Sequence, residues 1–381
     1  MTTDRGDVRK LRSVENEAVH DRNGLRPGSS LLIGILAVFL GLGAGWSARR
    51  IGQPTDEQLI ERARSDRAAG RLDAAEGHLR CVSGESPLAA EARAELGFVQ
   101  LAEGHVEAAE ESLRLAVLER LEMQPARDEL RWLYFNTFRV REAERLLETW
   151  LERTPDDYRS LLDLHFAEFR RQLPREGRPY LEQLESRQPG QLAVLRGLAY
   201  CDWQAGAAGS ARDRFAQAID RAPSDVETRL LAAEFSLEQG WSELSRDFLD
   251  VSEKGFVAAA EHDDRWWGLR GRLARGGGAA ANAVTLLTRA IERRPRESAW
   301  WQERGLALRE LGRATESAAD LEAAVRLERA KADMADLVFS GRLEDPDRAT
   351  IERMARLCEQ RGQRVAQRCW SLWSQLAAGS R

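Results

Sequence analysis

Few residues in this chain are spaced in a way that could support catalysis. Three consecutive glycines, Gly276 to Gly278, could cradle a phosphate, but no Lys-Ser or Lys-Thr pair follows them. His78 and Cys81 lie three residues apart on an expected helix, and no further metal ligand is near them in the sequence. Because no nucleophile, base and ligand set converges, the sequence predicts a protein that is not an enzyme and that holds no cofactor or metal.

Two other groups of residues have both a chemical and a structural interpretation. The acidic run 261–264 (EHDD) could hold a hard cation, but a solvated loop before a helix is the favoured interpretation. Cys358 and Cys369 flank a turn at Gly362, so they would lie near each other in a helical hairpin. A disulfide is conceivable there if the domain is exported, whereas two buried thiols are favoured. The sequence does not decide between the two.

The composition indicates that helices must position these residues. Of 381 residues, 43% are hydrophobic and 31% are charged, and β-branched residues are sparse, which is typical of helical proteins. With a net charge of −5, the chain lacks the excess of positive charge that is typical of proteins that bind nucleic acid. Four cysteines in so long a chain exclude a disulfide-dense secreted scaffold. We therefore expect an all-α protein without a nucleic-acid partner.

One segment is apolar enough to cross a lipid bilayer. No charge occurs between Arg26 and Arg49, and residues 29–48 would span roughly 30 Å as a helix. We expect an uncleaved transmembrane anchor, because a cleaved signal peptide would begin nearer the N-terminus and end at a better cleavage site. Small residues are common in membrane helices, but three at helical spacing could pair two anchors in a homo-oligomer. These are Ala37, Gly41 and Gly45.

The charges that flank the anchor leave its orientation open. Lys and Arg number three in residues 11–30 and four in residues 47–66, so the positive-inside rule does not decide. A short polar tail before one early anchor, here residues 1–28, usually stays in the cytoplasm. We therefore expect a single-pass membrane protein whose C-terminal domain follows a linker at 49–55 and lies outside the cytoplasm.

The remainder of the chain repeats with a period of 34 residues. A column of expected turn residues consists of Gly70, Gly104, Phe138, Gln172, Gly206 and Gly240. A column of small residues and a column of large apolar residues follow the turn residues at fixed distances in the sequence. All of these columns continue after an insertion of four residues near 260–263. The small column begins Ala75, Ala109, Ala143, Gly177, Ala211, Ser245, and the large one Leu79, Leu113, Leu147, Leu181, Phe215, Leu249. Residues 56–331 are therefore predicted to form eight units of two helices around a turn.

This pattern resembles the tetratricopeptide repeat family, whose motif is W-x2-L-G-x2-Y, then Gly, a small residue, an aromatic or Leu, and a closing Pro. The seventh repeat carries Trp267, Gly271, Gly278, Ala283, Leu287, Ala290 and Pro295. The resemblance implies a right-handed α-solenoid of about eight helix pairs that share one continuous core. Residues 332–381, which turn at Gly362, are expected to form a capping helical hairpin or a degenerate ninth repeat.

The resemblance also implies a scaffold that binds a protein or peptide partner in a concave groove along the first helix of each repeat. Aromatic residues recur 34 apart at two positions of that helix, one turn from each other, and polar residues lie beside them. The candidate groove residues are Phe98, Leu101, Trp132, Phe135, Asn136, Arg159, Phe166, Phe169, Arg170, Arg196, Tyr200, Trp203 and Gln204. In the last repeats the residues at the expected groove positions are charged, namely Arg272, Arg275 and Arg309.

Several alternatives remain open on the sequence alone. The aromatic side chains could pack one repeat against the next, or a segment of the same chain could fill the groove. The solenoid could be a structural element that self-associates in an envelope complex, or an accessory protein that binds glycan or cell wall. The sequence identifies neither the partner nor the oligomeric state.

Overall fold

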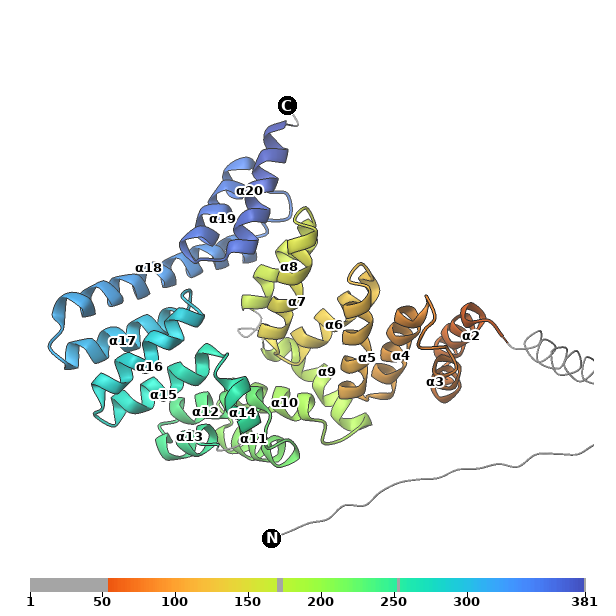
Figure 1. The fold of residues 1–381 in the computed structure, drawn as a ribbon, viewed down its shortest axis with the longest axis horizontal. Coiled ribbons are helices and arrows are strands. Elements are labelled where there is room, and N and C mark those ends of the chain that lie inside the picture. Colours follow the sequence, from red (N-terminus) through yellow and green to blue (C-terminus); the bar gives the residue numbers. More distant parts are fainter. Residues whose placement is uncertain (1–53, 170–173, 252–253, 380–381) are drawn as a thin grey trace, which may run out of the picture. The chain divides into compact units, whose positions relative to one another are not determined.

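The computed structural model describes residues 54–169, 174–251 and 254–379, and every regular element in these ranges is an α-helix (Figure 1). Most consecutive helices pack against each other as pairs joined by short turns. The first half contains α2 (Asp56–Ala68), α3 (Leu72–Arg80), α4 (Ala89–Glu103), α5 (Val106–Glu119), α6 (Gln124–Asn136), α7 (Val140–Arg153), α8 (Tyr158–Phe169), α9 (Pro174–Arg187) and α10 (Leu192–Gln204). The second half contains α11 (Ala208–Arg221), α12 (Val226–Glu238), α13 (Ser242–Leu249), α14 (Lys254–Ala260), α15 (Asp264–Gly276), α16 (Ala280–Arg293), α17 (Ser298–Glu310), α18 (Ala314–Phe339), α19 (Arg348–Gln360) and α20 (Arg364–Gly379).

The expected transmembrane helix at 29–48 lies outside the described residues, as do the polar tail and most of the linker. Among the helices that the structure does describe, none is both long and apolar enough to cross a membrane.

The helix pairs follow the repeat seen in the sequence. α8, α10 and α12 begin at residues 158, 192 and 226, a step of 34, and α15 and α17 begin at 264 and 298. Between α12 and α15 the step is longer by four residues, and the short helix α14 lies in this interval. The all-α helix-pair solenoid is therefore confirmed. The boundary expected at 331–332 falls inside α18, which runs unbroken for 26 residues.

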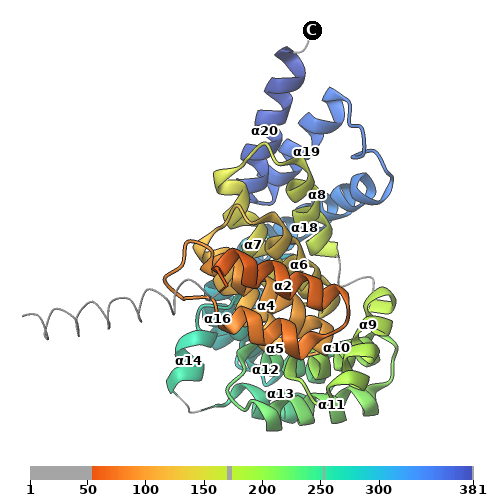
Figure 2. The same ribbon diagram turned by 90° about the vertical axis from the view of Figure 1, so that its right-hand side faces the viewer.

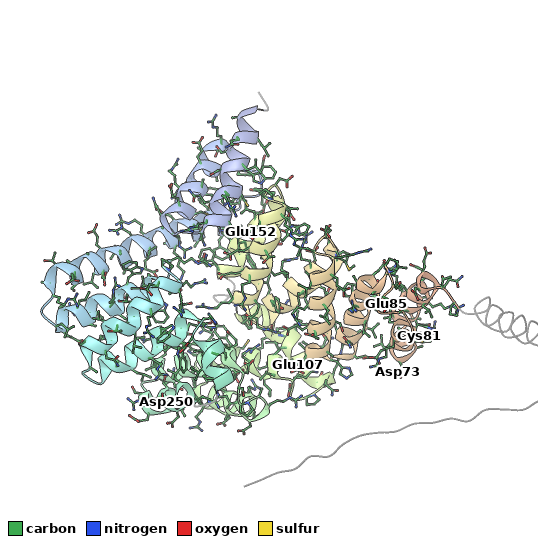
Figure 3. The ribbon with its side chains drawn as sticks, viewed as in Figure 1. Asp73, Cys81, Glu85, Glu107, Glu152 and Asp250 are labelled. Atoms are coloured by element: carbon green, nitrogen blue, oxygen red, sulfur yellow. The ribbon has the colours of Figure 1, made fainter. Side chains whose placement is uncertain are left out.

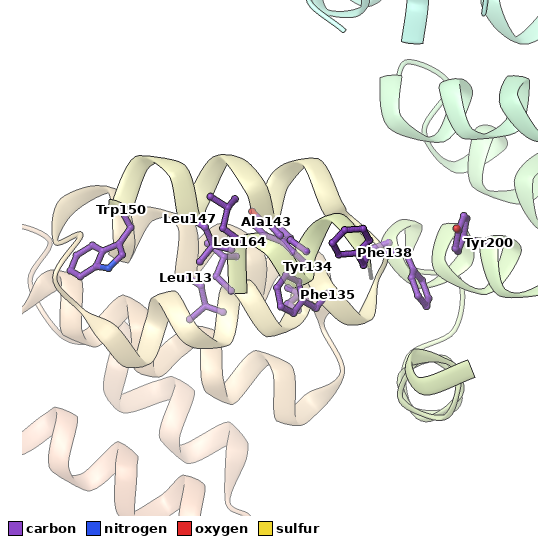
Figure 4. Close-up of a cluster of buried hydrophobic side chains, with 14 of the residues drawn as sticks. Leu113, Tyr134, Phe135, Phe138, Ala143, Leu147, Trp150, Leu164 and Tyr200 are labelled. Carbon is purple, nitrogen blue, oxygen red and sulfur yellow. The ribbon is translucent and has the colours of Figure 1, made fainter. Parts of the chain in front are cut away.

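In several described repeats, the turn between the two helices contains a residue with a left-handed backbone. Gly104 and Gly206 provide it with φ of 90° and 76°, because glycine lacks the Cβ that penalises this conformation. Phe138 takes the same place between α6 and α7 with φ of 56°. Its buried ring lies 5.1 Å from the ring of Tyr200 (Figure 4). Gly177 lies on another side of this ring, where a Cβ would come within 2.9 Å of Phe138 Cζ.

The small and the large apolar columns form the core between the two helices of a repeat (Figure 4). The large residues are at most 4% exposed at Leu79, Leu113, Leu147, Leu181, Phe215, Leu249 and Leu287. The helices approach each other closely at glycines of the first helix. A Cβ on Gly97 would lie 2.6 Å from Cγ of Leu113, and a Cβ on Gly271 would lie 2.6 Å from Cγ of Leu287. Glycine is therefore required at both places for packing.

The C-terminal hairpin folds back onto the middle of the solenoid. α19 and α20 pack as a pair, α20 contacts α7 and α8, and α18 contacts α8 (Figures 1 and 2). Trp370 Nε1 donates a hydrogen bond of 2.8 Å to His165 Nε2, and Arg361 Nη1 donates one of 2.7 Å to Glu168 Oε2. The hairpin thus contacts a repeat that is about two hundred residues distant in the sequence.

A second long-range contact joins α7 to the later repeats. Glu144, which is 3% exposed, accepts hydrogen bonds from Arg294 Nη2 at 2.9 Å and from Arg296 Nη2 at 3.0 Å. Arg141 on the same helix pairs with Asp264 at the start of α15. Burial alone would raise the pKa of Glu144, but the two arginines outweigh burial and hold that pKa below its usual value. The carboxylate is therefore charged and paired inside the protein.

Candidate functional site

Most side chains predicted to line the groove are buried within the chain itself. Those at most 8% exposed are Leu101, Phe135, Asn136, Phe169, Arg196, Tyr200 and Trp203. Phe98 and Phe166 are half-buried, whereas Trp132, Arg159 and Gln204 are exposed. Arg170 lies outside the described residues. Ligand binding by this set stays a prediction, and it applies most directly to the side chains that remain accessible.

Contacts between neighbouring repeats account for part of this burial. The ring of Phe135 lies 5.7 Å from that of Phe166, and the ring of Trp203 lies 5.8 Å from that of Phe235. Trp203 Nε1 also donates a 3.0 Å hydrogen bond to Glu238 Oε2. Such aromatic pairs each stabilise a fold by about 0.5–1.5 kcal/mol beyond the burial of their area. These aromatics therefore pack one repeat against the next.

The C-terminal hairpin and α18 cover the polar and aromatic side chains of α8. Phe169 is fully buried, and its ring lies 5.7 Å from that of Phe339 on α18. His165 is also buried, under Trp370 of α20. Burial lowers the pKa of His165 to about 4, so at neutral pH the uncharged ring accepts the indole hydrogen bond. A segment of the same chain thus occupies this part of the predicted groove.

Buried polar candidates find their partners inside the protein. Arg196 Nη1 donates a 2.9 Å hydrogen bond to Asp225 Oδ2, and Asn136 Nδ2 donates one of 2.8 Å to the main-chain oxygen of Trp132. Among the arginines at the groove positions of the last repeats, Arg275 has its Nε 2.8 Å from Glu303 Oε2. Since these groups already have partners, a ligand would have to displace them.

One part of the first-helix face remains open, over α2, α4 and the start of α6. A cleft of 330 Å³ lies there, with an apolar floor formed by Ala94, Phe98, Met123 and Pro125. Its charged rim consists of Arg64, Glu91, Glu95, Arg120 and Glu122. On α6, Trp132 is 41% exposed, and its ring lies 4.3 Å from that of Tyr180 on α9. Two of the aromatic side chains predicted to line the groove therefore remain available to a partner: Phe98, which is half-buried, and Trp132, which is exposed.

The rim of this cleft is ordered by an ion-pair network. Arg64 donates to Glu95 Oε1 at 2.7 Å and to Glu91 Oε1 at 2.6 Å. The guanidinium of Arg67 lies 5.5 Å from the centre of the Phe98 ring, within the range of a cation–π contact. The groove candidates taken from the sequence include none of these rim residues, and they do not include Met123, which precedes the first residue of α6. Apolar residues in the turn before α6 were the signal that could have indicated them.

The features that suggested chemistry serve structural roles. In the part of the chain that the structure describes, no group of three or more His, Cys, Asp or Glu side chains could hold a metal ion. Gly276 to Gly278 lie at the turn between α15 and α16. In the acidic run, Asp263 accepts the main-chain N–H of Arg265 as the N-cap of α15, and Asp264 Oδ2 accepts from Trp300 Nε1 at 2.7 Å.

None of the four cysteines forms a disulfide in the structure. Cys81 is exposed at the end of α3 (Figure 3). Cys358 Sγ lies 3.9 Å from His165 Nε2, and burial raises the pKa of this thiol far above its usual value. Burial also raises the pKa of Cys369, to about 11. The hairpin therefore contains two buried, unreactive thiols in place of the disulfide that was considered.

Comparison with known families identifies the repeat. A family model described as tetratricopeptide repeat matches residues 167–226 and 269–335, which include α10, α11, α16 and α17. The chain contains tetratricopeptide repeats. Domains built from tetratricopeptide repeats are typically non-catalytic, and they bind protein partners. No curated protein matches the sequence significantly.

Several solved structures, two of them described as tetratricopeptide repeat proteins, resemble the chain loosely. One from Parabacteroides merdae ATCC 43184 is 16% identical, with a TM-score of 0.35 over 66% of this chain and 98% of that one. The APC/C hetero-tetramer Cut9–Hcn1 is 14% identical, with a TM-score of 0.43 over 79% of this chain and 58% of that one. YrrB, described as a TPR protein with an unusual peptide-binding site, is 11% identical, with a TM-score of 0.33 over 48% and 92%. These superpositions are too loose to indicate what this chain binds.

Proposed function

We propose that the protein is a membrane-anchored scaffold that binds a peptide segment of a protein partner on the open face of α2, α4 and α6. The observation that carries the proposal is the open cleft beside the half-buried Phe98, with the exposed Trp132 at the same position of the next repeat. A buried aromatic anchor is a common centre of a protein interface. The other aromatic groove candidates are buried except Phe166, which is half-buried. Because the open cleft lies beside Phe98, a partner would bind near the N-terminal end of the solenoid.

The rim of the cleft favours a peptide over a uniformly charged ligand. Both signs of charge surround the apolar floor, on Arg64 and Arg120 and on Glu91, Glu95 and Glu122. Since Arg64 is already paired with Glu91 and Glu95, Arg120 and Glu122 are the groups that a peptide could bind without displacing this pairing. A peptide backbone carries both N–H and C=O groups, and its side chains can fill an apolar pocket. The proposed ligand is therefore an extended peptide with at least one large apolar side chain.

Affinity capture with residues 50–381 tests this proposal. We expect Phe98→Ala and Trp132→Ala each to weaken capture of one discrete protein at least tenfold, because each removes an aromatic contact worth about 1–2 kcal/mol or more. Leu311→Ala is the matched control, since Leu311 is also 41% exposed but lies after α17. Equal capture by all three variants would contradict the proposed site. Recovery of the chain alone would instead support a structural solenoid that self-associates.

Trp203 is unsuitable for this test because it is buried against Phe235 and bonded to Glu238. Its truncation would destabilise the fold and confound any loss of binding. The melting temperature of each variant should therefore be measured with its affinity, and only variants within a few degrees of the wild type should be compared.

We also propose that residues 29–48 anchor the protein and that the solenoid lies outside the cytoplasm. The support is the uncharged stretch between Arg26 and Arg49 and the short polar tail before it. A topology reporter fused after Arg381 tests the orientation. Activity from an export-dependent reporter is expected, and activity only from a cytoplasm-specific reporter would reverse the assignment.

A further inference from the structure

A second cleft lies where three distant segments of the chain meet. It has a volume of 250 Å³ and is walled by α7, by the turn between α16 and α17, and by the turn between α19 and α20. Its charged lining residues are Arg141, Glu144, Arg145, Glu148, Arg293, Arg294, Arg296 and Arg361. The cleft is formed by second helices and by turns, so it is separate from the peptide face proposed above.

Positive charge predominates in the wall of this cleft. Six arginines face two carboxylates there, and one of these carboxylates is shared. Arg294 and Arg296 both donate to Glu144, at 2.9 and 3.0 Å. Glu148 is more distant, with 3.7 Å between its Oε1 and Arg296 Nη1. The two acids therefore compensate only part of the charge.

The remaining arginines differ in how they are paired. Arg361 and Arg141 bind carboxylates of neighbouring helices, Glu168 and Asp264. Arg293 donates to the main-chain oxygen of Glu261 and makes no ion pair within the described chain. Arg145 is exposed, and among the described residues no carboxylate lies within ion-pair distance of it. The cleft thus holds two guanidinium groups that lack a carboxylate partner.

The size and chemistry of the cleft limit what could compensate this charge. A volume of 250 Å³ is below the range of about 300–1,000 Å³ that drug-sized ligands occupy, so the ligand must be small. Guanidinium groups match the oxygens of phosphate in a planar, bidentate geometry. A doubly charged oxyanion also compensates two arginines, which one chloride ion cannot do.

We propose that this cleft binds a phosphoryl group, either as a free small phosphate or as a phosphorylated side chain of a partner. Arg145 and Arg293 bind its oxygens, while Arg294 and Arg296 add positive charge beside Glu144. Because α7 and the two turns all contribute to the wall, the bound anion links repeats three, seven and eight and the C-terminal hairpin. Binding therefore stabilises the contacts by which the solenoid closes on itself.

Isothermal titration of the full chain tests the site with three probes at constant ionic strength: inorganic phosphate, pyrophosphate and a phosphoserine peptide. We expect saturable binding with a stoichiometry of one and a rise in melting temperature. Arg145→Gln should weaken binding about tenfold, the loss of one charge-assisted contact. Tighter binding of the peptide than of both inorganic anions identifies a partner as the source, and the reverse identifies a free phosphate.

Arg212→Gln is the matched control, because Arg212 is an exposed arginine on a second helix, α11, outside this cleft. Arg145 is itself exposed, so its variant keeps the fold, and an unchanged melting temperature without ligand will establish this. Arg293→Gln gives an independent second variant. The proposal is overturned if none of the three probes binds saturably, or if Arg145→Gln and Arg212→Gln bind equally well. Either result leaves the proposed peptide site untouched.

Discussion

The turn at Phe138 tests how this protein balances backbone strain against packing. Among the residues that the structure describes, Phe138 is the one non-glycine with a positive φ, 56°. A left-handed conformation costs an L-residue roughly 1–2 kcal/mol. The ring is only 2% exposed, and truncating a buried Phe to Ala typically costs about 3–5 kcal/mol. Packing therefore outweighs strain, which is why this position tolerates phenylalanine.

We expect Phe138→Ala to lower the free energy of unfolding by about 3–5 kcal/mol, because it removes the ring but keeps the strained Cβ. Phe138→Gly also removes the ring but relieves the strain, so it should be about 1 kcal/mol more stable than the alanine variant. That order is the reverse of the one expected inside a helix. Urea unfolding of the full chain, followed by circular dichroism, measures both values.

Gly206→Ala is the matched control, since Gly206 has φ of 76° and a Cβ there would meet no atom within 4 Å. It should therefore report the backbone cost alone, about 1 kcal/mol. A glycine variant of Phe138 that is no more stable than the alanine variant would refute the strain argument. A loss below about 1 kcal/mol in both variants would refute the packing argument.

Three further predictions concern the long-range contacts. Glu144→Gln should destabilise the fold by about 1–3 kcal/mol in urea unfolding, because it removes the buried carboxylate that Arg294 and Arg296 share and leaves them only the more distant Glu297 and Glu148, whereas the exposed Glu152→Gln should change little. Since the pKa of His165 is lowered to about 4, below pH 6.5 the unfolded chain binds a proton that the folded chain does not. The free energy of unfolding should then fall by about 3 kcal/mol between pH 6.5 and 4, and His165→Gln should remove this part of the pH dependence. Deletion of residues 346–381 should uncover the apolar side of α8 and cause aggregation measurable by light scattering; a soluble, monomeric product would show that the hairpin is not needed as a cover.

The repeat itself could be predicted because its determinants are local. Leu113 and Gly104 lie in columns whose spacing of 34 specifies two helices and a turn, and the structure places Leu113 in the core and Gly104 at a left-handed turn. Gly97, where two helices approach closely, occupies the position of the glycine in the W-x2-L-G-x2-Y motif, as Gly271 does. Each of these inferences needed only neighbouring residues, whose interactions the period determines.

The accessibility of the groove could not be predicted in the same way. Periodicity indicates which residues share a face, but it does not indicate which distant segment covers that face. Phe169 and Trp203 occupy the same position of the first helix, yet one contacts Phe339 of α18 and the other contacts Phe235 of the next repeat. The pair Glu168–Arg361 spans 193 residues, and no local pattern in either segment indicates the other. Only the folded chain distinguishes an open face from a covered one.

The docking of α20 on α7 and α8 has a consequence for synthesis on the ribosome. Repeats of a linear array can fold as they emerge, because each needs only its neighbour. α8 is different, since His165 and Phe169 are covered by α18 to α20, which are translated much later. At about 5–20 residues per second, the roughly two hundred intervening residues leave this apolar surface without its cover for some 10–40 seconds. We therefore expect a nascent chain of this protein to need a chaperone, or separation from other copies of itself, until α20 leaves the exit tunnel.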